Sequence, residues 1–110
     1  MAYDEELARR IRELVAGEPG LEEKKMFGGL GFMVGGNMAV AASGQRGLLV
    51  RVDPEESESL VASTPAYPME MRGRQMAGWL RVDSEQVAGA ELAAWVERGV
   101  AYARSLPKKG

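Results

Sequence analysis

The chain has 110 residues, enough for one domain, and a formal net charge of −2 with a pI near 5.2. It contains no cysteine and no histidine, which excludes disulfides, Ser-His-Asp or Cys-His catalysis, and metal sites built on these residues. No apolar run approaches the ~20 residues of a membrane span, and the acidic start is unlike a signal peptide. We therefore expect a cytoplasmic protein, and the acidic balance disfavours DNA binding through overall charge.

The first expected element is a helix over about 4–16, with Asp4 as a plausible N-cap and Glu5 and Glu6 in its first turn. The sequence GEPG at 17–20 ends it. The spacing predicts an apolar stripe formed by Leu7, Ile11, Leu14 and Val15.

Short extended segments follow at about 23–27 and 30–34, and a tight Gly-Gly-Asn turn at 35–37 returns the chain through 38–42. The third full strand is predicted at 47–52. Its alternation places Leu48, Val50 and Val52 on one face and Leu49 and Arg51 on the other.

A second helix is predicted from Asp53 to about Ala62, with Pro54 at its first position and Glu56 completing a capping-box pattern. A loop is expected at 63–68. A hairpin then joins 69–72 to 75–82 around Arg72-Gly73-Arg74. In its second strand, alternation separates two sets of side chains, namely Met76, Gly78, Leu80 and Val82 from Ala77, Trp79 and Arg81.

The last helix is expected from Gly89 or Ala90 to about Ser105, with Pro107 ending it and a disordered tail over 107–110. The order is then α-β-β-β-α-β-β-α. It indicates a single α+β domain of two layers, with a five-stranded antiparallel sheet and helices on one face. The buried stripe of the last helix is predicted to be Leu92, Trp95, Val96 and Val100.

Three ordered motifs cover most of the chain. The first is KMFGG at 25–29, with FM at 32–33 and NMA at 37–39; the second is PMEMRGRQMAGW at 68–79; the third is WVERG at 95–99 with YA at 102–103. Together they resemble the TfoX N-terminal domain family over about 4–107. The structural signature residues of this resemblance are Phe27, Gly28, Gly29, Asn37, Gly73, Gly78, Trp79 and Trp95.

The resemblance implies a fold similar to secretion chaperones, and it supplies no catalytic residue, cofactor or metal ligand. Named members are Sxy/TfoX competence regulators, thought to act with a cyclic-AMP receptor protein. They carry a C-terminal domain without counterpart in these 110 residues. We therefore expect a stand-alone, non-enzymatic interaction module, acting on an unidentified protein partner in transcription regulation. A homodimer through the edge strands of the sheet is a further expectation.

Two alternatives stay open, namely a small-ligand or anion-binding module and direct DNA binding. The glycines of 28–36 could cradle phosphate, but no lysine follows them as in a Walker loop, and Gly29-Leu30-Gly31 does not continue into a dinucleotide fingerprint. Turns and a hairpin explain these glycines better. The basic candidates for partner or anion contact are Lys24, Lys25, Arg72, Arg74 and Arg81.

Methionine is frequent, and the interpretation we favour is core filling. The alternative is an exposed apolar patch that binds a second copy or a partner. The residues concerned are Met26, Met33, Met38, Met69, Met71 and Met76.

Overall fold

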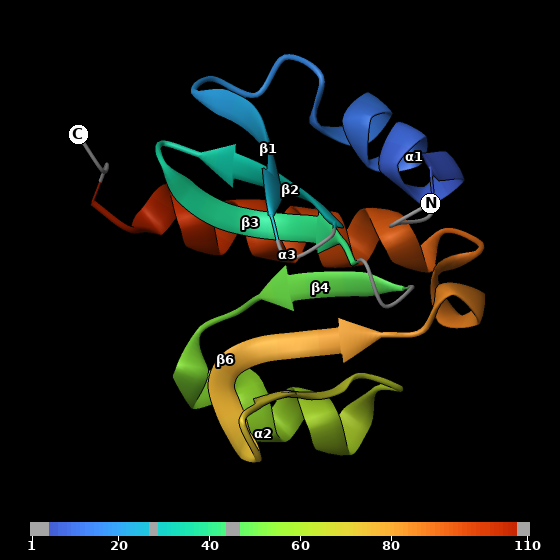
Figure 1. Cartoon of the computed structure of the whole chain (residues 1–110), viewed down its shortest axis with the longest axis vertical. Helices are drawn as coiled ribbons and strands as arrows, with labels where there is room; N and C mark the ends of the chain where they lie inside the picture. The colour runs from blue at the N-terminus through green and yellow to red at the C-terminus, as the bar shows by residue number, and fades with distance from the viewer. Residues whose placement is uncertain (1–4, 27–28, 44–46, 108–110) are drawn as a thin grey trace.

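The computed structural model describes residues 5–26, 29–43 and 47–107. Figure 1 shows helices behind a curved sheet. In chain order the elements are α1 (Glu5–Val15), β1 (Leu21–Met26), β2 (Gly29–Val34), β3 (Asn37–Ala42), β4 (Leu48–Arg51), α2 (Pro54–Ser63), β5 (Tyr67–Met71), β6 (Arg74–Val82), the 3-10 helix η1 (Ser84–Val87) and α3 (Glu91–Ser105).

The strands form one antiparallel sheet of six strands in the order β1-β2-β3-β4-β6-β5. The α+β class is confirmed, but the expected five strands are one too few. Each of the four extended segments predicted before α2 forms its own strand, because β1 pairs with β2 over its whole length. β5 begins inside the predicted loop, since Tyr67 pairs with Arg81. η1 was not predicted.

Residues with positive φ form the tight turns between strands. Gly35 and Gly36 have φ of 61° and 84°, and Arg72 and Gly73 have φ of 55° and 78°. Two consecutive residues of this kind are typical of a type I′ turn, whose twist matches that of the strands it joins. Both predicted hairpins are therefore confirmed, while the connection at 27–28 lies outside the described residues.

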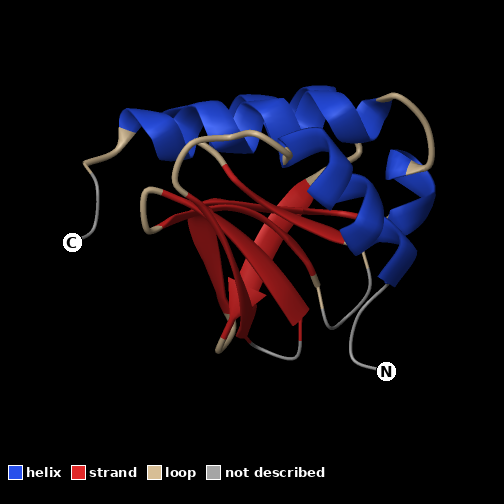
Figure 2. Ribbon diagram, turned by 90° about the horizontal axis from the view of Figure 1, so that it is seen from above, coloured by secondary structure: helices blue, strands red, loops and turns tan. Residues whose placement is uncertain are grey.

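The helices pack on one side of the sheet, as Figure 2 shows for α3. The predicted apolar faces of α3 and β4 are confirmed, as is that of β6 for Leu80 and Val82, whereas Met76 is only partly buried. In α1, Leu14 is a correction: it is 46% exposed, because at 100° per residue it falls at the border of the face that packs on the core, while Ala8 is buried. The fully buried large side chains are Phe32, Ile11, Leu48, Leu80, Leu92, Val40, Val50, Val52, Val82 and Val87.

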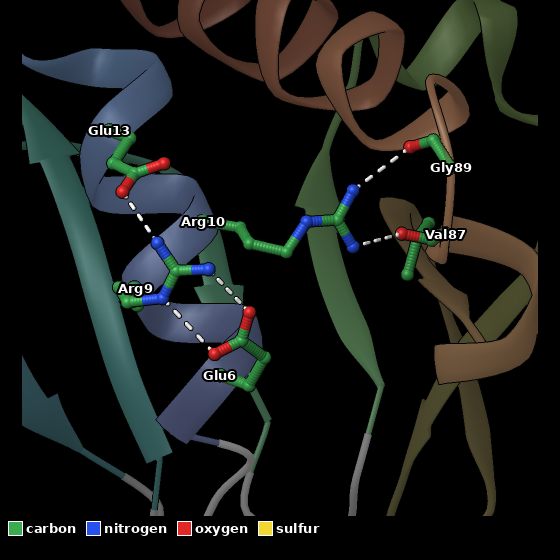
Figure 3. A network of polar contacts seen from close by, with 6 residues as sticks. All are labelled: Glu6, Arg9, Arg10, Glu13, Val87 and Gly89. Carbon is green, nitrogen blue, oxygen red and sulfur yellow. Dashed lines mark hydrogen bonds and ion pairs between the residues drawn. The ribbon is translucent and has the colours of Figure 1, made fainter.

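Polar contacts hold the ends of the helices. Arg10 of α1 donates to the carbonyl oxygens of Val87 at 2.8 Å and Gly89 at 3.0 Å, which ties α1 to the start of α3 (Figure 3). The predicted cap of α2 is confirmed, because the Asp53 carboxylate accepts from the N–H of Glu55 at 2.9 Å. The predicted Asp4 cap lies outside the described residues.

Candidate interaction surface

The sheet carries a second hydrophobic cluster on the side away from the helices. Met38, Ala41 and Leu49 are its buried members, at 6%, 5% and 7% exposure. None of its residues comes from a helix, and Figure 1 looks onto this side, with β3 in front of α3 and β6 in front of α2. We call this side the open face. Half-buried side chains packed against the cluster are Met33, Met69 and Trp79.

A β-bulge brings two methionines together on the open face. The register of β2 and β3 shifts between Phe32 and Met33, so that Met33 lies opposite Met38 and Ala39 is the extra residue. A bulge of this kind re-aims the side chains that follow it. The sequence did not predict this pairing. The interpretation that the methionines fill the core is confirmed for Met38, which is buried. Met33 and Met69 instead lie partly exposed at the margin of the cluster on the open face.

The strand registers define a row of residues that crosses the open face. Directly opposite residues of neighbouring strands point to the same face. The row therefore has small or apolar residues at its centre and a cation towards each end, where β1 and β6 lie roughly 19 Å apart at four strand spacings. In strand order its members are Lys24, Gly31, Ala41, Leu49, Arg81 and Tyr67.

Two arginines lie on the β4–β6 side of the cluster. Arg81 donates to the hydroxyl oxygen of Ser43 at 2.7 Å. The guanidinium of Arg51 lies 5.1 Å from the ring centre of Trp79 and 5.7 Å from that of Tyr102 on α3. Such stacking fixes the position of the cation while its edge can still donate hydrogen bonds. The apolar cluster thus has Arg81 beside it on the open face, while Arg51 stacks on Trp79 and also contacts α3.

The structure does not bring the five basic candidates together. Lys24 and Arg81 share the open face, but Lys25 is opposite Leu30 and points to the helix side. Arg72 and Arg74 lie at the β5–β6 turn, and three strands, β2, β3 and β4, separate β6 from β1. A single anion site that uses all five is therefore not formed.

A backbone N–H of the glycine turn at 35–36 already forms a hydrogen bond within the domain. The N–H of Gly35 donates to the carbonyl oxygen of Gly20 at 3.2 Å. The hollow beside it, of about 440 Å³, contains an ion pair between Glu18 and Arg104. Described hollows also lie between α2 and α3, between α2 and β6, and on α1, and none of these four is lined by the basic candidates on β1 or at the β5–β6 turn.

Two carboxylates among the described residues have lowered pKa values. A hydrogen bond from Arg9 lowers the pKa of Glu6 (Figure 3), and one from Arg12 lowers the pKa of Glu23. Both shifts favour the ionised form, whereas a general acid needs a raised pKa. No group of three or more acidic residues in the part of the chain that the structure describes is placed to hold a metal ion.

A comparison with protein families decides the identity. The model of the TfoX N-terminal domain matches residues 13–103. The chain belongs to the TfoX N-terminal domain family. Comparison with curated proteins gives no match. Among the helices that the structure describes, none is both long and apolar enough to cross a membrane.

Most of the signature residues that the structure describes in this TfoX N-terminal domain lie at buried positions or in turns. The Asn37 amide donates to the carbonyl oxygen of Pro107 at 2.9 Å, which anchors the end of α3, and Trp95 is buried in the main core. Gly73 turns the hairpin, and Gly78 has φ of 85° within β6, a strand that is strongly curved in Figure 1. Trp79 differs, because it lies on the open face. Gly29 begins β2, while Phe27 and Gly28 lie outside the described residues.

Proposed function

We propose that this TfoX N-terminal domain is a non-enzymatic, cytoplasmic interaction module that binds a protein partner on the open face of its sheet. The observation that carries the proposal is the second hydrophobic cluster, which no described helix covers. Methionine and tryptophan are frequent at protein-binding surfaces, since methionine adapts its shape and tryptophan buries a large area.

The chemistry of the open face indicates what the partner presents. Met33, Met69 and Trp79 offer apolar contact, and Arg51 and Arg81 offer cations beside it. The matching surface is an apolar segment with carboxylates along one side, because charge complementarity orients the two surfaces. The proposed role in transcription regulation rests on family membership. Neither anion binding nor direct DNA binding gains support from the dispersed basic residues.

The test compares capture from native lysate by the tagged domain and by Met33→Glu and Met69→Glu variants, with and without nuclease. Ala93→Glu adds the same charge at an exposed position of α3 and is the matched control. We expect a partner that survives nuclease and binds the domain and the control, but not the open-face variants. The same ranking must hold with purified partner, measured by calorimetry.

Two results would contradict the proposal. Equal binding by folded open-face variants would move the site elsewhere on the domain. Loss of all partners on nuclease treatment would replace protein binding by nucleic-acid binding. Circular dichroism of each variant shows that a loss of binding is not a loss of folding.

A further inference from the structure

The two edges of the sheet differ in how well they can accept another strand. β5 contains Pro68, and its register with β6 is irregular between Pro68 and Glu70, features that block pairing at an edge. β1 contains no proline and pairs with β2 without a register shift over residues 21–26. Residues 22–25 are all exposed. β1 is therefore the edge that another strand can extend.

The hydrogen bonds show which backbone groups of β1 point outward. Gly20 accepts from Gly35 on the β2 side, so the even-numbered residues that follow direct their backbone groups toward β2. The odd-numbered residues then face outward. The N–H of Leu21 agrees, because it donates to Glu18 at 3.3 Å rather than to β2. The outward groups available for pairing are the C=O of Leu21 and the N–H and C=O of Glu23 and Lys25.

Symmetry restricts how two copies of β1 can pair. An antiparallel pair with two-fold symmetry has its axis perpendicular to the sheet, so one residue lies opposite itself. With Glu23 at the axis, Glu22 of each copy lies opposite Lys24 of the other on the open face. Glu23 meets its own copy, but Arg12 already binds both of its carboxylate oxygens at 2.8 and 3.0 Å and compensates the charge.

We propose that two copies of this domain pair through β1, antiparallel and centred on Glu23, to form one continuous sheet. The helices of both copies then lie on the same side, and the two open faces become neighbours. Charged edge strands usually discourage pairing. Here the order Glu-Glu-Lys-Lys at 22–25 makes two opposite-charge pairs in this register, and opposite charges directly across a strand pair are favourable.

Sedimentation equilibrium of the full chain at low salt, over a range of concentrations, tests the proposal with a charge swap. Lys24→Glu or Glu22→Lys alone places like charges opposite each other, and we expect the dimer to weaken about tenfold or more. The double variant Glu22→Lys/Lys24→Glu restores both pairs and returns the dimer to near its original strength.

Lys25→Glu is the matched control, because Lys25 lies opposite Leu21 in this register and its change has a smaller effect. Lys25→Pro removes an outward N–H without removing a bond to β2, so we expect it to abolish the dimer while circular dichroism shows a folded chain. A wild-type chain that stays monomeric, a double variant as weak as the single ones, or equal effects at positions 24 and 25 would each overturn the proposal.

Discussion

Replacing Gly99 by alanine tests how closely α3 packs on the sheet. A β-carbon at this position would lie 2.4 Å from the carbonyl oxygen of Ala39 and 2.9 Å from Cγ1 of Val40. Helix propensity alone predicts that alanine stabilises α3 by about 1 kcal/mol. The contact opposes this, since the nearest atom belongs to the backbone of β3, a central strand, and overpacking typically costs about 1–3 kcal/mol or more.

We expect crowding to win and Gly99→Ala to lower the free energy of unfolding by about 1–2 kcal/mol, or the melting temperature by roughly 4–8 °C for a domain of this size. Urea denaturation with matched m-values measures the change. Ala101→Gly, at an exposed position of the same helix, controls for propensity and should cost about 1 kcal/mol. A Gly99→Ala variant as stable as the wild type or more so would refute the close approach of α3 to β3.

The remaining predictions concern a cap, a bend and an ion pair. Asp53→Ala should lower the free energy of unfolding by about 1 kcal/mol in urea denaturation, because the first turn of α2 loses its side-chain acceptor. Gly78→Ala should cost about 1–3 kcal/mol in the same assay, since its φ is 85° and a β-carbon would lie 3.0 Å from the oxygen of Val52. Arg12 lowers the pKa of Glu23, so the ion pair contributes above the unfolded pKa of Glu23 and its contribution is lost as pH falls through the lowered folded pKa. In an NMR titration of the Glu23 carboxyl, Arg12→Ala should move the midpoint up toward the ordinary glutamate value; an unmoved midpoint would show that the pair does not form in solution. Because both side chains are partly exposed, the stability effect should stay below about 1 kcal/mol.

Several elements could be predicted because their signals are local. Leu48, Leu49 and Val50 alternate between the two faces of β4 because successive side chains of a strand point to opposite sides. Asp53 and Pro54 start α2 through a cap and a fixed φ, both of which depend only on neighbouring residues.

The candidate site was less predictable, since it depends on which strands become neighbours. The bulge that pairs Met33 with Met38 has no local marker, and the exposure of Leu14 follows from where α1 lies on the core. Likewise, Lys24 and Lys25 are adjacent in the sequence, and their side chains point to opposite faces of β1. The two faces differ in function only because the helices cover one side of the sheet.

By itself, then, the amino-acid sequence determined the α+β class, the two hairpin turns at 35–36 and 72–73, the cap of α2 and the family of this chain, because each depends on residues close together in the chain or in an ordered motif. Only the tertiary structure decided the six-strand order, the open face and the place of β1 at one edge of the sheet. The physical reason is that pairing of distant strands is a long-range choice, made by burial of the whole core. That choice places Lys24 and Arg81 on one face and Arg72 and Arg74 at a distant turn.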